Sequence, residues 1–156
     1  MVYIETPEEI TSPRKKFEKW YAIFQTRIGW IGATASEKGI TRTTLPSETK
    51  KGCTSVLKPV LQFHLQNRDR FNYIQEKLER LFNGEPESFN DIPIDYQDSS
   101  LFFRRAWETC KSIPQGETRS YKWVATKIGS PRAYRAIGQS MAKNPLPIII
   151  PCHSET

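Results

Sequence analysis

The sequence predicts an α/β (α+β) fold in which a small N-terminal unit of strands and helices precedes a helical C-terminal unit. Two observations predict this class. Aromatic and β-branched residues punctuated by glycines fill residues 17–46, whereas apolar residues recur at helical spacing farther along the chain. The helical pattern is interrupted at residues 84–99 by GEPESFNDIPIDYQDS, rich in Pro, Asp and Ser, which is typical of a connector. We therefore place the units at residues 1–94 and 95–156, with the boundary near residues 93–99.

The N-terminal unit begins with residues 1–15, whose weak hydrophobic pattern predicts a loose arm. FEKWYAIFQTRIGWIGATASEKGITRTTLP then predicts two or three strands joined by tight turns, with SEKGI as a hairpin turn. Residues 58–82 predict a helix that Asn83-Gly84 ends. Its helically spaced apolar residues are Phe71, Ile74, Leu78, Leu81 and Phe82.

The C-terminal unit opens with an amphipathic helix over residues 100–113, since Phe103, Trp107 and Cys110 share one face. A shorter helix follows in TRSYKWVATKIG, with Thr118 or Ser120 as its N-cap and a glycine at its exit. Trp107 and Trp123 are most simply core residues. Two short helices joined by a glycine turn predict a helix-turn-helix.

The last helix is expected to begin at Ser130-Pro131, a cap followed by a proline in the first turn. Its residues separate into a polar face, an apolar face and small positions that would permit close approach to a surface. The polar face could contact phosphates. A solvated basic face on a packed helix is the plainer interpretation, because periodicity alone does not distinguish these two roles. The polar face holds Arg132, Arg135 and Gln139; the apolar face Tyr134, Ile137 and Met141; and the small positions are Ala133, Ala136 and Gly138.

The charge distribution and the cysteine and histidine content narrow the classes of function. The net charge of +6 is concentrated between residues 104 and 143, where nine Lys/Arg accompany two Asp/Glu, a pattern suited to a polyanion. Cys53, Cys110 and Cys152 lack CxxC spacing, and His64 and His153 are the two histidines, so no metal is expected. We expect Cys53 to be a loop thiol, Cys110 a core residue and His64 a half-buried strand residue.

No run of about 18 apolar residues occurs, and MVYIETPEEI lacks a secretion signal. The sequence therefore predicts a soluble intracellular protein with no membrane association.

The segment PIIIPCH combines a hydrophobic run with a cysteine and a histidine. Ile148–Ile150, bounded by two prolines, predict a short buried strand. A thiol at its exit can become a nucleophile when a base removes its proton, which His153 could do for Cys152. Neighbouring strand residues point to opposite faces, so the two side chains meet only if the chain turns. A buried structural cysteine is the alternative.

The stretches IPQGETRSY and GSPRAYRAIGQSMAKNPLPIIIPCH together resemble the methylated-DNA-protein-cysteine methyltransferases, the O6-alkylguanine-DNA alkyltransferases. The resemblance covers residues 101–153 in unbroken order, and TRIGWIGATASEKGIT is similar to the strand region of the family's N-terminal domain. It implies an RNase H-like N-terminal unit and a winged helix-turn-helix-like DNA-binding unit that carries the reactive cysteine.

The resemblance also implies a function: DNA repair by irreversible, single-turnover transfer of a methyl or alkyl group to Cys152. The donor would be O6 of guanine in duplex DNA, with O4 of thymine as a further candidate. The family needs no metal or organic cofactor and no obligate protein partner. We accordingly expect a monomer acting on double-stranded DNA in the cytoplasm, or in the nucleus of a eukaryote.

The family's site residues map onto this sequence by motif. Cys152 would accept the alkyl group, His153 would take its proton through a water, Tyr121 would crowd the flipped nucleotide's phosphate and protonate guanine, and Asn144 would lie near the thiolate. Arg135 would enter the base stack in place of the extruded nucleotide. The remaining DNA-binding positions implied are Ser130, Arg132, Ala133, Tyr134, Ala136, Gly138 and Gln139.

The sequence departs from the family pattern after His153. Ser154, Glu155 and Thr156 replace an arginine and a small apolar residue, and the family's pocket loop and closing helix with its glutamate do not follow. We therefore expect a truncated C-terminus, with a lesion-binding protein that transfers poorly as the alternative. A regulator reading the major groove is a third hypothesis, disfavoured because alanines and glycine on the last helix offer few base-edge donors. The bulk of Tyr134 also departs from the family's small residues.

Overall fold

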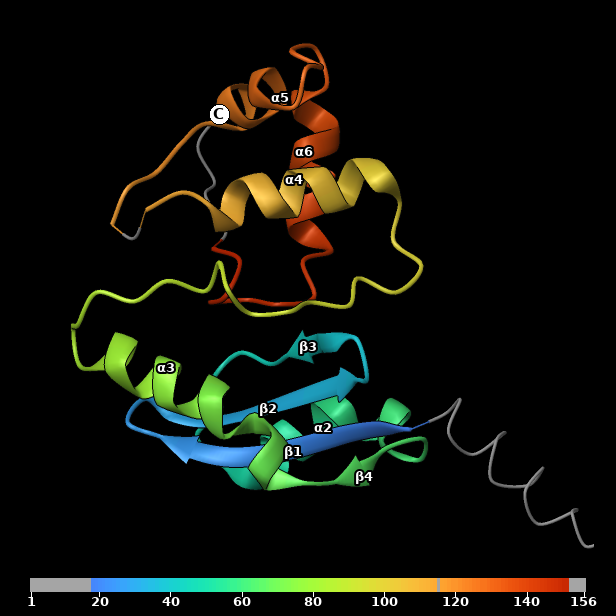
Figure 1. Ribbon diagram of the computed structural model, residues 1–156, viewed down its shortest axis with the longest axis vertical. Helices are drawn as coiled ribbons and strands as arrows, with labels where there is room; N and C mark the ends of the chain where they lie inside the picture. Colours follow the sequence, from blue (N-terminus) through green and yellow to red (C-terminus); the bar gives the residue numbers. More distant parts are fainter. Residues whose placement is uncertain (1–17, 115, 152–156) are drawn as a thin grey trace, which may run out of the picture.

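A computed structural model describes residues 18–114 and 116–151 of the chain. A sheet unit and a helical unit lie one above the other, with a long connector between them (Figure 1). This architecture confirms the predicted fold class. The elements are β1 (Lys19–Thr26), β2 (Gly29–Ser36), β3 (Gly39–Thr43), α2 (Lys50–Leu61), β4 (Leu65–Gln66), the 3-10 helix η2 (Arg68–Phe71), α3 (Asn72–Phe82), α4 (Leu101–Lys111), α5 (Tyr121–Lys127) and α6 (Tyr134–Ala142).

The sheet has the strand order β3-β2-β1-β4. β1 pairs with β2 and β2 with β3 in antiparallel hairpins, whereas the two-residue β4 runs parallel to β1. The predicted strands and the SEKGI turn are thus confirmed. Gly39 is required at that turn: its φ is +153°, and a Cβ there would lie 2.5 Å from the carbonyl oxygen of Pro93 in the connector.

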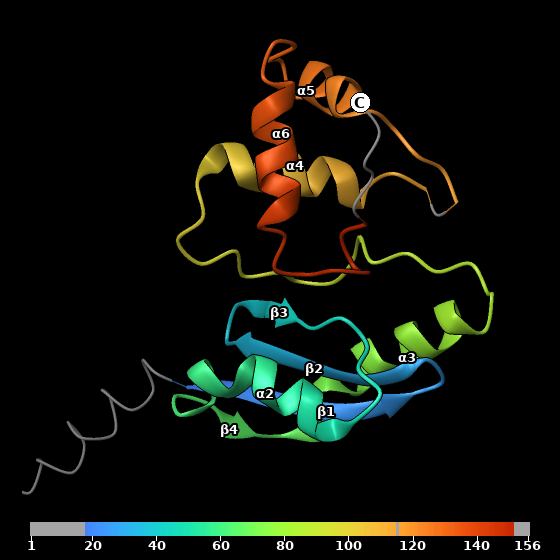
Figure 2. The same cartoon turned by 180° about the vertical axis from the view of Figure 1, so that it is seen from behind.

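Alternation along β1 divides the apolar residues between two layers. Ile23 faces α2 and contacts Leu57 and Cys53, while Phe24 belongs to the larger core that includes Ile74 of α3. The two helices accordingly cover opposite faces of the sheet, as the front and back views show (Figures 1 and 2). Cys53 is 1% exposed on α2, so the prediction of a loop thiol is wrong.

The single helix predicted over residues 58–82 is also wrong. The chain forms α2, which ends at Leu61 after Pro59, then β4 and η2 before α3 begins at Asn72. The interruption has a tertiary cause, because residues 65 and 66 pair with β1. His64 lies just before β4, half-buried, and its Nδ1 is 2.6 Å from the carbonyl oxygen of Val60.

In the C-terminal unit, α4 packs against both α5 and α6. Ser100 caps α4 by accepting from the backbone N–H of Phe103 at 3.1 Å, and Ser120 caps α5 in the same way. The predicted packing face of α4 is confirmed, since Trp107 and Cys110 are buried. Trp107 Nε1 also donates to the carbonyl oxygen of Ser140 on α6 at 2.8 Å, which links the two helices.

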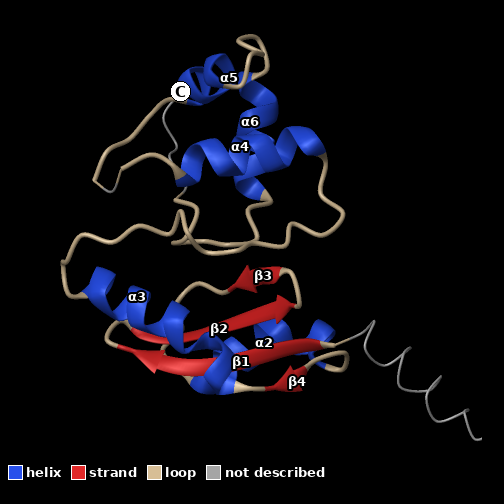
Figure 3. Ribbon diagram, viewed as in Figure 1, coloured by secondary structure: helices blue, strands red, loops and turns tan. Residues whose placement is uncertain are grey.

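The connector bonds to both units and is drawn as loop in Figure 3. Ile40 of β3 donates to the carbonyl of Pro93 at 3.0 Å and accepts from Asp95 at 2.8 Å. Tyr96 then stacks on Trp107 of α4 at a centroid distance of 5.5 Å and donates to Glu108. One buried apolar cluster runs through both units. The boundary near residues 93–99 stays a prediction within this connector.

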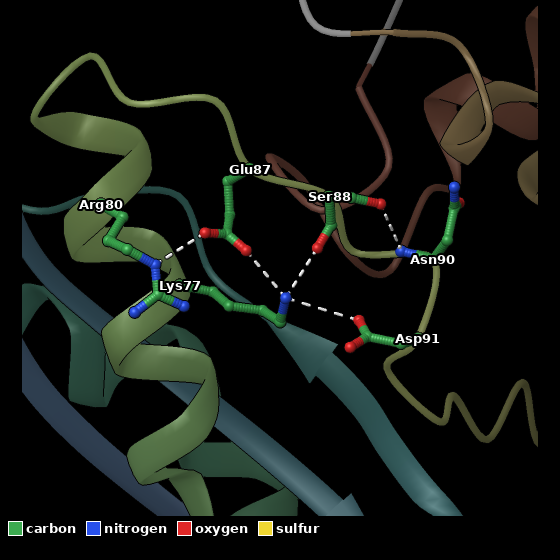
Figure 4. Close-up of polar contacts among 6 residues, drawn as sticks. All are labelled: Lys77, Arg80, Glu87, Ser88, Asn90 and Asp91. Atoms are coloured by element: carbon green, nitrogen blue, oxygen red, sulfur yellow. Dashed lines mark hydrogen bonds and ion pairs between the residues drawn. The ribbon is translucent and has the colours of Figure 1, made fainter.

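An ion-pair cluster holds the first part of the connector on α3 (Figure 4). Glu87 accepts from Lys77 Nζ at 2.8 Å and from Arg80 Nε at 2.7 Å, and Lys77 also meets Asp91 at 3.4 Å. The Arg80 hydrogen bond first, and then that of Lys77, lower the pKa of Glu87 from 4.5 to about 2. The connector therefore begins at a charged attachment and ends at an aromatic one.

Two features of the described residues concern membrane and metal binding. No helix among them is long and apolar enough to cross a membrane. Within residues 18–114 and 116–151, no three His, Cys, Asp or Glu side chains gather as a metal ion would need.

Candidate active site and nucleic-acid interface

The surface of α5, α6 and the turn between them carries exposed cations. Arg135 is exposed on α6, and Arg132 is exposed in the turn before it. Lys122 and Lys127 are exposed on α5. Because α5, the turn and α6 are consecutive and α5 packs on α6, these cations share one end of the unit. A polyanion such as a nucleic-acid backbone is the chemical complement of this surface.

The last helix begins later than the sequence predicts. α6 starts at Tyr134 with Ala133 at its N-cap position, and no described side chain caps it. Ser130 instead accepts from Ala133 N through its own carbonyl oxygen at 2.8 Å, so Ser130-Pro131 form the preceding turn. Arg132 therefore lies in the turn, and it does not share a helical face with Arg135 and Gln139.

The apolar face predicted for this helix is correct only in part. Ile137 and Met141 are buried against the core, as expected. Tyr134 is 44% exposed, so its assignment to the packed face is wrong. The reason is the start of α6: Tyr134 occupies the first helical residue, where the chain leaves the turn.

Tyr121 and Gly138 meet where α5 crosses α6. A Cβ added to Gly138 would lie 3.2 Å from Cε2 of Tyr121, so the small residue makes room for the tyrosine ring. Ala136, like Ala133, is half-buried, and Gln139 is exposed. We predicted Gly138 as a position for close approach to DNA. The structure gives it a contact within the protein, while its role toward DNA stays a prediction.

Trp123, which sequence reasoning assigned to the core, packs against the core cluster at its edge. It is half-buried, and the guanidinium of Arg119 and the ammonium of Lys127 lie 5.3 and 5.7 Å from its ring centroid. Cation–π contacts of this kind hold long basic side chains in place. The spacing of four residues on either side of Trp123 was the signal for this arrangement.

The segment before the cysteine is a turn. Residues 144–150 contain no strand, although Ile149 and Ile150 are buried as predicted. The strand prediction is wrong because Pro145, Pro147 and Pro151 remove backbone donors, and the loop closes on itself through an Ile150 N to Leu146 O bond of 2.8 Å. The apolar run fills a core without joining a sheet.

Asn144 closes this loop with its side chain. Its Nδ2 donates to the carbonyl oxygen of Ile150 at 2.7 Å, and its Oδ1 accepts from the backbone N–H of Leu146 at 2.8 Å. One amide group thus joins the beginning of the loop to its end. Ile148 lies between them with φ = +80°, a left-handed conformation that is costly for a β-branched residue.

Cys152 and His153, the predicted nucleophile and base, lie outside the described residues. The described chain ends at Pro151, which borders a cavity of about 620 Å³. The connector and the end of α4 form its other walls. Lys111 contributes a charged side chain that is only 5% exposed and lies 3.3 Å from Glu108. The lining residues include Glu87, Ser88, Phe89, Ile148 and Ile149.

The arrangement defines a class: an α+β protein whose basic helix-turn-helix leads, through a braced loop, into a Pro-Cys-His segment. Comparison with known proteins identifies the family. Residues 19–96 match the model of the 6-O-methylguanine DNA methyltransferase ribonuclease-like domain, and residues 101–154 match that family's DNA-binding domain. The chain belongs to the 6-O-methylguanine DNA methyltransferase family, as the resemblance predicted.

Individual relatives agree with this assignment. The chain is 37% identical over 134 residues to the methylated-DNA-protein-cysteine methyltransferase of Methanosarcina barkeri, covering 86% of this chain and 80% of the relative. It is 32% identical over 136 residues to the constitutive methyltransferase of the same name from Bacillus subtilis, covering 86% and 78%.

Solved structures give the same result for the fold. The crystal structure of the Mycobacterium tuberculosis O6-methylguanine methyltransferase superposes with a TM-score of 0.72 at 29% identity, covering 88% of this chain and 78% of that one. The M. tuberculosis protein in complex with DNA superposes with a TM-score of 0.68 at 28% identity, covering 87% and 77%.

Proposed function

We propose that this protein repairs alkylated DNA by moving the alkyl group from O6 of guanine in a duplex onto Cys152, once per molecule. The observation that carries the proposal is the ordered match of both family domains across residues 19–154, which includes the Pro-Cys-His segment. Its relatives are named for cysteine methyl transfer from methylated DNA. Such a reaction takes place where chromosomal DNA lies, in the cytoplasm or the nucleus.

The reaction follows from the chemistry of a thiolate. The sulfur of Cys152 attacks the saturated carbon of the O6-alkyl group, a carbon–sulfur bond forms and the carbon–oxygen bond breaks. The electron pair stays with the guanine, which takes a proton and becomes ordinary guanine. His153 would remove the thiol proton through a water, and Tyr121 would supply the proton to the base. The thioether is stable, so the protein is consumed.

Access to the lesion requires the nucleotide to leave the helix. Arg135, exposed on α6, is suited to fill the space left in the base stack and so offset part of an unstacking cost of a few kcal/mol. The basic residues around it would hold the backbone without regard to sequence, and this affinity falls as salt rises. Asn144 would keep the loop that leads to Cys152 in its bonded form.

Intact-protein mass spectrometry tests the proposal. The chain is incubated with a duplex carrying one O6-methylguanine, with the undamaged duplex, and in parallel as the Cys152→Ser variant. We expect a gain of about 14 Da that depends on the lesion, maps to Cys152 by peptide sequencing and is absent from Cys152→Ser.

Two results would contradict the proposal. An unchanged mass together with preferential binding of the lesion duplex would identify a lesion-binding protein. An unchanged mass with no preference for the lesion would remove alkylguanine as the ligand altogether.

A further inference from the structure

The outer edge of the sheet meets the loop that leads to the cysteine. β3 is the edge strand, and its last residue, Thr43, donates its backbone N–H to the carbonyl oxygen of Pro145 at 3.0 Å. The Thr43 hydroxyl donates to the carbonyl oxygen of Pro147 at 3.2 Å. An unpaired edge strand exposes such groups, and here the 144–150 loop takes the place of the next strand.

The backbone conformation of the 144–150 loop requires support from outside the loop. Ile148, the residue after Pro147, has φ = +80°, which an unsupported loop would leave for a more favourable conformation. Within the loop, the side chain of Asn144 bonds to Leu146 and Ile150, whereas the carbonyls of Pro145 and Pro147 bond outward, to Thr43. Thr43 is 4% exposed, and its hydroxyl bond to Pro147 is partly buried.

We propose that Thr43 is a positioning residue for alkyl transfer, through which the N-terminal unit holds the 144–150 loop, and with it Cys152, in the reactive arrangement. The inference rests on the proposed function for its chemistry, but the loop-holding step stands on the contacts alone. It gives the N-terminal unit, which matches the family's ribonuclease-like domain, a part in the reaction.

Thr41 offers a matched control in the same strand. The Thr41 hydroxyl lies 2.6 Å from that of Thr34. The residue is 5% exposed, so Thr41 and Thr43 are both buried threonines of β3. Thr41→Val and Thr43→Val each remove one hydroxyl hydrogen bond of a buried threonine while nearly keeping the side-chain volume. Only Thr43→Val removes one that reaches the loop, and Thr43→Ser restores it.

The test measures two quantities for each variant and the native protein. The first is the single-turnover rate of methyl transfer from O6-methylguanine duplex at saturating DNA. We expect Thr43→Val to slow transfer about fivefold, the equivalent of one lost hydrogen bond, with Thr41→Val unchanged and Thr43→Ser restored. The second is amide hydrogen exchange at Leu146 and Ile150, which we expect to quicken in Thr43→Val beyond any change in Thr41→Val.

The two measurements separate this proposal from the proposed function. If the native chain transfers no methyl group while Thr43→Val still quickens exchange in the loop selectively, the function fails and the loop-holding role stands. Equal exchange in Thr43→Val and Thr41→Val would overturn the role of Thr43, whatever the transfer rates. Should Thr43→Val fold poorly, Thr43→Ala makes the same deletion without the added methyl group.

Discussion

Replacing Asn144 by alanine should destabilise the protein more than its half-buried position suggests. The amide side chain makes two hydrogen bonds, of 2.7 Å to the carbonyl of Ile150 and 2.8 Å from the N–H of Leu146. Both partner residues are fully buried. N144A therefore leaves a buried acceptor and a buried donor without their partner, at about 1–3 kcal/mol each.

The partial exposure of residue 144 admits water to the site, which places the expected loss toward the lower half of the sum, about 2–4 kcal/mol. For a domain of this size that corresponds to a fall in Tm of about 5–15 °C. Urea denaturation followed by circular dichroism gives the free energy of unfolding. Asn83→Ala is the control, because Asn83 accepts from Arg27 in an exposed contact and should change stability by less than about 0.5 kcal/mol. A loss for N144A no larger than that for N83A would refute the closure of the loop by Asn144.

Three further changes test other parts of the structure. Glu87→Gln should remove a pH dependence of the folding stability. The pKa of Glu87 falls from 4.5 to about 2 on folding, so its carboxylate stabilises the fold above pH 4.5 and stops doing so as pH drops toward 2. The urea midpoint of the native protein should therefore fall over that range more than the midpoint of E87Q. Gly32→Ala should cost about 1–3 kcal/mol in urea unfolding, because its Cβ would lie 2.6 Å from Leu57 Cδ1; an unchanged midpoint would refute that packing. Arg135→Ala should slow methyl transfer at least about tenfold in single-turnover kinetics, whereas Lys38→Ala, an exposed charge in the β2–β3 turn, should not; equal rates would exclude a role for Arg135 in flipping.

Sequence patterns predicted the features that depend on near neighbours. The cap at Ser120, the SEKGI turn at Gly39 and the packed face of α4 with Trp107 and Cys110 all follow from local geometry, and each is present. The same local reasoning placed the start of α6 three residues early, because the cap-and-proline signal at Ser130 is satisfied equally well by a turn.

The sequence-based predictions fail where residues distant in the chain decide the conformation. Ile148–Ile150 have the composition of a strand, yet Thr43 and Asn144 hold them in a turn, and neither can be identified as a partner from the isoleucines themselves. The interruption before α3 has the same origin, since residues 65 and 66 are drawn into pairing with β1. The cation–π contacts of Trp123 could be foreseen only by reading the basic residues at its i−4 and i+4 positions together.

The two units are joined at both ends of the helical unit. β3 bonds to the connector through Ile40 as the chain enters that unit, and to the 144–150 loop through Thr43 as the chain leaves it. One short edge strand therefore meets the entry and the exit of the unit that carries the basic helices. Because the buried apolar cluster also runs through both units, separating them would expose the strand edge and the core together. The sheet unit therefore contacts both the connector and the 144–150 loop through hydrogen bonds of its edge strand.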